Sequence, residues 1–338
     1  MNNNKEIIFI SGVAGFLGSH IADFFINRGH KVIGCDNLIG GYLDNVPSKV
    51  EFYQYDLTDF NSIVKITKGV DIVFHCAATA YEGLSVFSPF LVTKNIVDAS
   101  VSLITASVIN NVHRFINYSS MARYGNQTVP FTEDMKPAPE DPYGIGKYAV
   151  ELYLKNLAET HGMKWVNIIP HNIIGPRQKY DDPYRNVASI MINLMLQGRQ
   201  PIIYGDGKQK RCLSFVADVN SVLDKLAFAD NVIGEDINIG PDEEFITINK
   251  LATTIANLLS FDLKPIYYPD RPCEVKFATC SADKARKLLE YKTKYKLEDG
   301  LREMIDYIKK RGIKPFKYHL DLEIINEKTP KTWKDKIF

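Results

Sequence analysis

A tyrosine and a lysine at helical spacing are the first residues in this chain that could do chemistry. Tyr143 and Lys147 lie in the stretch DPYGIGKYAVE, and residues four apart are neighbours on one face of a helix. A phenol with a pKa of about 10 is a poor base at neutral pH, but a nearby ammonium favours the phenolate. The pair could therefore take a proton from a hydroxyl group whose carbon gives up hydride. The spacing alone is weak evidence, because Tyr204 and Lys208 show it in a glycine-rich stretch.

Two adjacent serines stand upstream in the stretch YSSMARYG, residues 118–125. The stretch is typical of a strand that runs into a loop, which would present Ser119 and Ser120 at the strand end. Met121 and Ala122 follow, and neither side chain can accept or release a proton. The stretch thus offers hydroxyl groups without an acid or base beside them. For Arg123, a substrate contact and a surface position both stay open.

These residues need a scaffold, and the pattern of apolar runs predicts one. Short apolar runs typical of strands alternate with helical patterns at 19–28 and 91–110. Such alternation is typical of a parallel sheet with helices on both faces. The predicted strands are 7–10, 31–35, 50–55, 71–76, 114–119 and 165–170, with one more at 235–240. The sequence therefore predicts an α/β fold, a Rossmann doubly wound parallel sheet.

The rhythm changes after Gly175, where the segment 176–186 is too polar for a core element. Further helical patterns follow at 187–198, 248–259, 282–289 and 297–310, and a polar tail begins at about Arg311. This predicts a smaller mixed α/β lobe in the C-terminal part. The expected division is a first domain over 1–172, completed by about 212–240, and a substrate lobe formed by 173–211 and 241–338.

A glycine-rich turn follows the first predicted strand in the stretch SGVAGFLGSH. Gly12, Gly15 and Gly18 stand three residues apart, which permits a tight turn and a close approach of backbone N–H groups to a pyrophosphate. Asp36 ends the second strand, where a carboxylate can bind both ribose hydroxyls and would repel a 2′-phosphate. The pattern favours NAD over NADP as the cofactor.

Further cofactor contacts are expected at the ends of the third and fourth strands. Asp56 could meet the adenine amino group or cap a helix, and both readings stay open. The run HCAATA, residues 75–80, has the small residues expected where a backbone lies against a cofactor. The predicted cofactor-binding residues are Gly12, Gly15, Phe16, Leu17, Gly18, Asp36, Asn37, Asp56, Leu57, Ala77, Ala78, Tyr143 and Lys147.

In this order, the glycine trio, Asp36, Ser120 and the Tyr143/Lys147 pair make the chain resemble the extended short-chain dehydrogenase/reductase family. The resemblance is to its NAD-dependent nucleotide-sugar epimerases and dehydratases, and it covers nearly the whole chain. It implies a Rossmann fold with a C-terminal sugar-nucleotide lobe, a bound NAD, and a catalytic set of Ser120, Tyr143 and Lys147. Gly146 departs from the serine that is usual before this lysine, which bears on a peripheral contact.

The resemblance also implies a nucleoside diphosphate sugar as substrate, with UDP the commonest and GDP or dTDP still open. Asn172, Arg211 and Arg271 resemble residues that hold the diphosphate, and guanidinium groups match phosphate oxygens. Ala278 stands where related 4-epimerases carry a gate residue beside the sugar C2 substituent, so its small side chain would leave room for an N-acetyl group. The stretch AYEGLSVFSP, residues 80–89, is expected to line the sugar pocket, with Ser85 as its hydrogen-bonding group. The implied substrate contacts are Ser85, Ser120, Asn172, Arg211, Arg271 and Ala278.

The leading hypothesis is reversible C4 epimerisation of a UDP-hexose of the N-acetylhexosamine, glucose or uronate type, for cell-surface polysaccharide precursors. In related 4,6-dehydratases an Asp-Glu pair follows the hydroxyl residue, whereas Met121 and Ala122 stand here, which disfavours elimination. A decarboxylase and a 4-dehydrogenase remain alternatives. A non-catalytic NAD-bound scaffold is disfavoured because it would have no chemical reason to keep Ser120, Tyr143 and Lys147.

Composition limits which binding partners and which cellular compartment we expect for this protein. Lys plus Arg, 41, and Asp plus Glu, 40, nearly cancel, so no global field draws the protein to nucleic acid. The five cysteines form no metal or dithiol pair. No apolar run approaches the about 18 residues of a membrane helix, and MNNNKEIIFISG lacks signal-peptide features. We expect a cytoplasmic protein without metal, nucleic acid or membrane, and the resemblance implies a homodimer.

Overall fold

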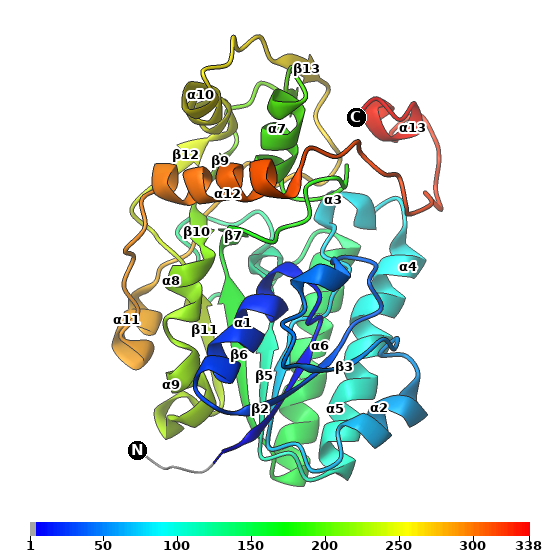
Figure 1. The fold of residues 1–338 in the computed structure, drawn as a ribbon, viewed down its shortest axis with the longest axis vertical. Coiled ribbons are helices and arrows are strands. Elements are labelled where there is room, and N and C mark those ends of the chain that lie inside the picture. The colour runs from blue at the N-terminus through cyan, green and yellow to red at the C-terminus, as the bar shows by residue number, and fades with distance from the viewer. Residues whose placement is uncertain (1–4) are drawn as a thin grey trace.

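Residues 5–338 are described by a computed structural model in which a smaller lobe stands on the upper edge of a parallel sheet (Figure 1). Residues 1–4, which begin the stretch examined for a signal peptide, lie outside the described residues. The sheet has seven parallel strands in the order β11-β6-β5-β4-β1-β2-β3. These are β1 (Ile7–Ser11), β2 (Lys31–Cys35), β3 (Glu51–Tyr53), β4 (Ile72–His75), β5 (Arg114–Tyr118), β6 (Lys164–Pro170) and β11 (Glu235–Ile239). The predicted Rossmann fold is confirmed.

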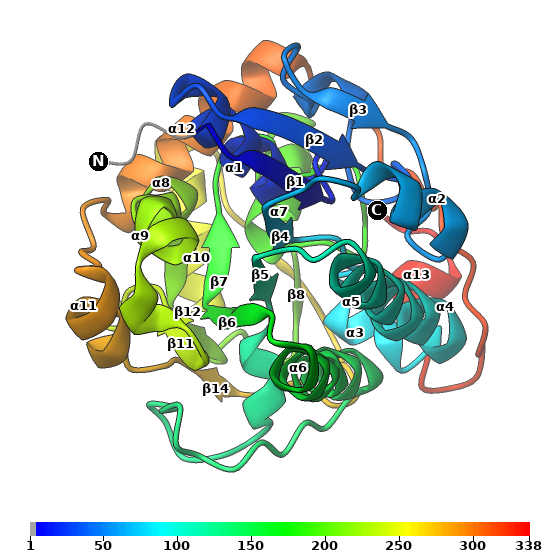
Figure 2. The same cartoon turned by 90° about the horizontal axis from the view of Figure 1, so that it is seen from below.

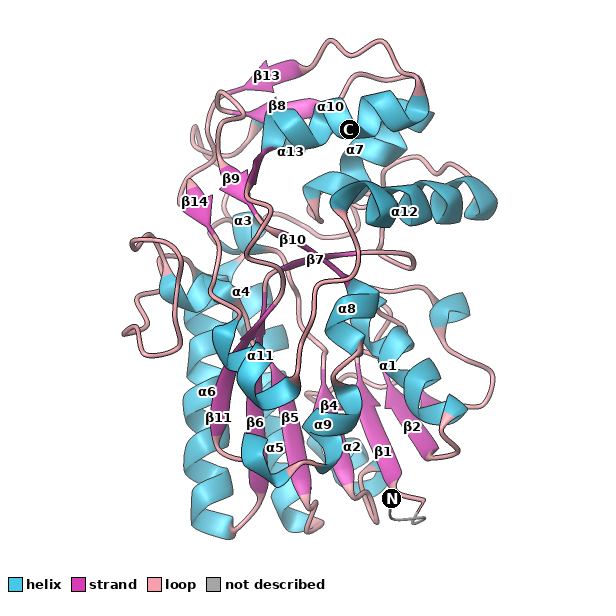
Figure 3. Ribbon diagram, turned by 90° about the vertical axis from the view of Figure 1, so that its left-hand side faces the viewer, coloured by secondary structure: helices cyan, strands magenta, loops and turns pink. Residues whose placement is uncertain are grey.

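The chain reverses its direction of winding between β1 and β4. From β1 the sheet grows through β2 to β3, and from β4 it grows through β5 and β6 to β11. The crevice outside the carboxyl ends of the strands at such a switch point is where open α/β sheets bind ligands. The topology therefore places a binding site above β1 and β4, below the smaller lobe (Figure 3).

Helices cover both faces of the sheet, as the view from below shows (Figure 2). On one face lie α1 (Phe16–Asn27), α8 (Val216–Asn220), α9 (Leu223–Phe228) and α11 (Asp283–Leu289). On the other lie α2 (Phe60–Ile66), α4 (Pro89–Thr93), the π-helical turn η2 (Lys94–Asp98), α5 (Ala99–Ile109) and α6 (Pro142–His161). Ile8 and Ile10 of β1 pack on the first layer and Phe9 on the second. Burial on both faces explains why the strands are nearly continuous apolar runs.

The expectation that no segment is long and apolar enough to span a membrane was wrong for one helix. The continuous helix Pro89–Ile109 meets that length and composition, with a mean hydropathy of 1.3 in its most apolar window. Its Val92, Ile96 and Leu103 are buried in the core between the sheet and its neighbouring helices. Packing against the Rossmann sheet is therefore one reason for its apolar composition.

The smaller lobe is built from short strands and three longer helices around its own core. Its helices are α7 (Val187–Leu196), α10 (Ile248–Leu259) and α12 (Leu297–Arg311). Its strands are β7 (Asn172–Ile174), β8 (Ile202–Tyr204), β9 (Lys210–Arg211), β10 (Leu213–Phe215), β12 (Ile246–Thr247), β13 (Ile266–Tyr268) and β14 (Phe277–Ala278). Short 3-10 helical turns lie outside this lobe at η1 (Leu43–Asn45), η3 (Met121–Tyr124) and η4 (Asp230–Val232).

We propose the two-lobe division predicted from the sequence. In this division the chain returns from the smaller lobe to the sheet through α8, α9 and β11.

The C-terminal tail crosses back to the region of α3 (Glu82–Ser85) and α4, and it ends with α13 (Lys331–Lys334) (Figure 1). Trp333 packs edge-on against Tyr184, with ring centroids 5.3 Å apart. The Glu323 carboxylate accepts hydrogen bonds from the backbone N–H groups of Phe90 and Leu91, at 2.9 and 2.8 Å. The tail is thus integrated into the fold, since it satisfies donors at the start of α4.

Candidate active site

The glycine turn forms the floor of a cavity between the ends of β1 and β4. Gly12 has a φ of +73°, and a Cβ there would lie 2.9 Å from the backbone of Ala77. A Cβ on Gly18 would lie 2.3 Å from the Gly12 carbonyl oxygen, so α1 can start this close to the turn only without one. The glycines therefore bring bare backbone to the start of a helix, the arrangement that suits a pyrophosphate.

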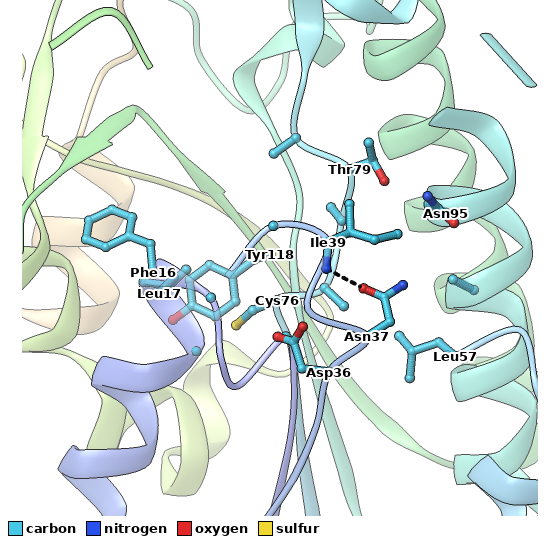
Figure 4. Close-up of a pocket in the computed structure, with 18 of the residues that line it drawn as sticks. Phe16, Leu17, Asp36, Asn37, Ile39, Leu57, Cys76, Thr79, Asn95 and Tyr118 are labelled. Carbon is cyan, nitrogen blue, oxygen red and sulfur yellow. Dashed lines mark hydrogen bonds between the residues drawn. The ribbon is translucent and has the colours of Figure 1, made fainter. Parts of the chain in front are cut away.

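Asp36 and Asn37 follow β2 and are held by hydrogen bonds along the cavity (Figure 4). The Asp36 carboxylate accepts from the backbone N–H groups of Ala14 at 3.0 Å and Leu38 at 2.7 Å. Burial raises the pKa of Asp36, and these hydrogen bonds oppose the shift. The Asn37 side chain accepts from Ile39 N–H at 3.2 Å. The carboxylate is therefore fixed in place before any ligand binds.

Every residue predicted to contact the cofactor lines this first cavity, which has a volume of about 220 Å³. Asp56 lies on it and accepts from the Asn37 amide at 3.0 Å. Asp59, and not Asp56, caps α2, because its side chain accepts from Ser62 N–H. The structure thus answers the helix-cap question for Asp56, whereas its contact with adenine stays a prediction.

The Tyr143/Lys147 pair lies on the first turns of α6. Asp141 caps this helix by accepting from Gly144 N–H at 2.8 Å, and Pro142 occupies its first position. The Lys147 ammonium donates to the carbonyl oxygen of Tyr118 at the end of β5. Burial lowers the pKa of Lys147 to about 8. This places the ammonium against the carboxyl end of the sheet, beside the first cavity.

Tyr143 stands at the border of two cavities, because it lines the first and a second of about 380 Å³. Burial raises the pKa of its phenol to about 12, and the Ser120 side chain and the Arg185 guanidinium oppose the shift. Ser120 caps η3 by accepting from Ala122 N–H at 3.2 Å, and it lines the second cavity. The tyrosine and serine hydroxyls therefore face the space where a second ligand would meet the first.

Most predicted substrate contacts surround the second cavity, including Ser120, Asn172, Arg211, Arg271 and Ala278. Arg271 Nε lies 3.3 Å from a Glu274 carboxylate oxygen, and Arg211 Nη2 lies 4.0 Å from the other. Ser85 lines neither cavity. Its hydroxyl donates to the Glu82 carbonyl oxygen at 2.7 Å and lies 3.3 Å from Asp141. Ser85 is thus a buried neighbour of the capping aspartate, and its contact with the sugar stays a prediction.

Sequence reasoning missed several residues of the site. Arg185 lines both cavities, and its Nη2 donates to the Gly40 carbonyl oxygen at 2.9 Å. Glu82 lines the second cavity, and Phe338 of the tail does so too. Sequence signals existed for two of them: Glu82 lies in the stretch 80–89, which is expected to line the sugar pocket, and Arg185 lies in the segment 176–186, which is too polar for the core.

Asn95 is another missed residue, and it belongs to the π-helical turn η2. It lines the first cavity, and its side-chain nitrogen is buried without a hydrogen-bond partner among residues 5–338 (Figure 4). Single π-helical turns are frequent at functional sites. Gly146 packs on this turn, since a Cβ there would lie 3.3 Å from Ile96. The absence of the usual serine at residue 146 therefore lets α6 approach η2 closely.

Arg123 contacts neither cavity and is 4% exposed. Its Nη1 lies 2.7 Å from Glu151 of α6 and 3.2 Å from Asp236 of β11. The Ser119 hydroxyl donates to the same Glu151. Both readings of Arg123 from the sequence were wrong: it is a buried ion-pair partner that ties η3 to α6 and the sheet edge.

The first cavity fits NAD by the chemistry of its lining. The turn at Gly12, where a Cβ would lie 2.9 Å from the Ala77 backbone, brings bare backbone to the cavity. The Asn95 side-chain nitrogen, which has no partner among residues 5–338, offers a hydrogen-bond donor. Asp36 is held at the end of β2, where a ribose is expected. A Rossmann cavity of this kind, bordered by serine, tyrosine and lysine, defines an NAD-dependent enzyme of the short-chain dehydrogenase/reductase type.

Comparison with known proteins agrees with this class. The model of the NAD dependent epimerase/dehydratase family matches residues 8–240. A putative UDP-glucose 4-epimerase of Methanocaldococcus jannaschii is 32% identical, covering 90% of this chain and 98% of its own. The UDP-glucose 4-epimerase of Thermotoga maritima, solved with UDP-glucose, is 32% identical with a TM-score of 0.86, covering 90% and 99%. The UDP-glucuronic acid 4-epimerase of Bacillus cereus, solved with UDP-glucuronic acid and NAD, is 27% identical with a TM-score of 0.84, covering 90% and 100%.

The chain belongs to the NAD dependent epimerase/dehydratase family. It is an NAD-dependent epimerase, and NAD is its cofactor.

Proposed function

We propose that this protein interconverts the C4 configuration of a UDP-hexose of the N-acetylhexosamine, glucose or uronate type. The observation that carries the proposal is the position of Tyr143, which borders both the cofactor cavity and the second cavity. A hydroxyl group of a sugar in the second cavity would therefore meet the phenol beside the cofactor. The solved relative with bound UDP-glucose supports a UDP-sugar as the ligand of that cavity.

In this mechanism Tyr143 removes the proton of the sugar 4-hydroxyl, and Ser120 relays it between the phenol and the sugar oxygen. The NAD that the first cavity would hold supplies reversible hydride transfer at C4, so that a 4-keto sugar could be reduced again on its opposite face. Lys147 would hold the nicotinamide ribose, and its ammonium favours the phenolate. Because no net oxidation occurs, the protein should retain its cofactor through many turnovers.

The residues beside Ser120 support epimerisation over 4,6-elimination. Met121 and Ala122 both line the second cavity, so they occupy places from which a proton could reach the sugar. Neither side chain can donate or accept one. A 4-keto sugar in this cavity would therefore meet no additional acid or base from these two positions.

Asn172, Arg211 and Arg271 are proposed to hold the diphosphate. Both guanidinium groups line the second cavity on the side of the smaller lobe, and arginine is suited to bidentate binding of phosphate oxygens. Ala278 is 6% exposed at the same cavity. Its small side chain supports room for an N-acetyl group at the sugar C2 position.

The test is to incubate the purified protein, without added cofactor, with UDP-N-acetylglucosamine, UDP-glucose and UDP-glucuronate. Inversion at C4, read from the H4 coupling in NMR spectra, is expected for at least one. Tyr143→Phe should lower the rate by at least about a hundredfold, because general base catalysis contributes about that much. The variant should retain its NAD. A 4-keto-6-deoxy product without C4 inversion, or a wild-type protein inert toward all three UDP-sugars, would contradict the proposal.

We also propose that the protein works as a cytoplasmic homodimer in the supply of cell-surface polysaccharide precursors. The dimer is supported by an apolar stripe on α6, formed by Ile145, Leu152 and Tyr153, which are 53%, 52% and 47% exposed. Residues seven and eight apart share a helix face. A second copy of the chain could cover this stripe by packing helix against helix.

A further inference from the structure

We propose that Glu82 makes the substrate site select neutral hexoses and reject uronates. This inference rests on the proposed function, because it concerns which UDP-sugar the same site accepts. Glu82 begins α3 and lines the second cavity together with Tyr143. Its side chain is accessible through that cavity, and within residues 5–338 no hydrogen bond or ion pair engages its carboxylate.

The Glu82 carboxylate lies close to the reacting centre, between groups that act on its charge in opposite directions. Burial raises the pKa of Glu82 and Asp141 adds to the shift, whereas Arg211 and Arg271 oppose it. The charge of Glu82 is near enough to raise the pKa of Tyr143. A sugar whose 4-hydroxyl meets Tyr143 would therefore lie within the field of Glu82.

The cations that line the second cavity in the described part of the chain already have anionic or carbonyl partners. Arg271 and Arg211 approach Glu274 at 3.3 and 4.0 Å, and both are proposed to hold the diphosphate. Arg185 donates to the Gly40 carbonyl oxygen and lies 3.7 Å from Asp182. A further negative charge on the sugar would thus lack a cation of its own.

The position of the carboxylate in a uronate explains why this arrangement would discriminate between uronates and neutral hexoses. C5 is bonded to C4, so the carboxylate that a uronate carries on C5 would lie near Tyr143 and hence near Glu82. Two like charges in a cavity with limited water repel each other strongly. A neutral hexose instead offers hydroxyl donors, and a hydrogen bond to an ionised acceptor is about twice as strong as one between neutral groups.

The experiment compares UDP-glucose and UDP-N-acetylglucosamine with UDP-glucuronate by kcat/KM, in wild-type protein, Glu82→Gln and Glu244→Gln. Glu244 is exposed in the smaller lobe and lines neither cavity, so its variant matches the change in net charge. Wild-type protein should favour the neutral sugars by at least about tenfold, a difference of about 1.4 kcal/mol. Glu82→Gln should reduce this preference by about tenfold, and Glu244→Gln should leave it unchanged.

A second measurement separates this inference from the proposed function. The affinities of the neutral and uronate nucleotides are measured by calorimetry on wild-type protein and on Tyr143→Phe, which needs no turnover. Weaker binding of UDP-glucuronate in both supports charge selection even if no epimerisation is found. Equal or tighter binding of UDP-glucuronate, or a sugar preference that is the same in wild-type and Glu82→Gln proteins, overturns the inference. Failure of every UDP-sugar to invert at C4 overturns only the proposed function.

Discussion

At the scale of single residues, Tyr143 and Lys147 share a helix face but have different surroundings. Burial raises the pKa of the Tyr143 phenol to about 12, so the phenol needs positive charge nearby in order to lose its own proton and act as a base. The Lys147 ammonium is bonded to the Tyr118 carbonyl oxygen, whereas the Arg185 guanidinium acts on the phenol from the border of the two cavities. Lys147 is the cation that the sequence pairs with Tyr143. The structure adds a second cation, Arg185, which the sequence did not indicate.

The lowered pKa of Lys147 predicts that the epimerisation rate falls at alkaline pH. Lys147 carries its charge below about 8 and loses it as the pH rises through that value, so the epimerisation rate should fall there. Lys147→Arg should be slower but should show no such fall, because a guanidinium stays charged to a pKa above about 12. Initial rates across the pH range, read by NMR, test this.

A control for Lys147→Arg is needed because high pH can also unfold the protein. Samples held at high pH and assayed at neutral pH should recover their full rate. The same alkaline fall in the wild type and the variant would show that another group is responsible.

At the scale of elements, the turn between β1 and α1 sets how closely backbone can approach a ligand. Gly12 combines a positive φ with a Cβ position that lies 2.9 Å from the Ala77 backbone. Gly69, in the loop before β4, has nearly the same φ of +74° but no atom within 4 Å of its Cβ position. Substitution of Gly69 therefore tests backbone strain alone, whereas substitution of Gly12 tests backbone strain together with a steric clash.

Gly12→Ala should remove bound NAD and lower the free energy of unfolding by more than Gly69→Ala does. For Gly69→Ala we expect a loss of about 1 to 2 kcal/mol, the cost of a left-handed conformation with a Cβ, and normal NAD content. NAD released on denaturation and urea unfolding curves measure the two effects. Equal losses in both variants would mean that the close approach at Gly12 has no role in cofactor binding.

At the scale of the whole molecule, the apolar helix Pro89–Ile109 and the neighbouring α6 form the layer that carries the exposed stripe of Ile145, Leu152 and Tyr153. The tail fastens the start of this layer through Glu323 and reaches the second cavity with Phe338. The end of the tail therefore forms part of the wall of the second cavity.

The homodimer proposal predicts that Leu152→Glu combined with Tyr153→Glu gives a monomer. Two buried charges on each side would oppose helix packing between copies. Light scattering after size-exclusion chromatography measures the mass, and NAD content checks the fold. Ile325→Glu, which changes another exposed apolar residue, 60% exposed in the tail, should remain a dimer. A monomeric wild-type protein, or a dimer that tolerates both charges, would contradict the proposal.

The sequence by itself determined the succession of strands and helices along the chain and a set of residues that line the first cavity. Those features are local: apolar runs fix the strands, Gly12 and Asp36 follow β1 and β2 directly, and Asp56 follows β3 closely, so topology must bring them to one edge. The pair on α6 is local too, because helical pitch aligns Tyr143 with Lys147. Each of these predictions needed only the neighbours along the chain.

Only the tertiary structure decided which distant side chains share a cavity or a buried charge. Arg123 meets Glu151 and Asp236 across three elements, and Arg185 reaches the border of the two cavities. Burial and electrostatic energy depend on distances between residues far apart in sequence, and a single chain of letters does not contain those distances. For the same reason, only the folded molecule shows that the Glu82 carboxylate, on which sugar selection is proposed to depend, has no partner among residues 5–338.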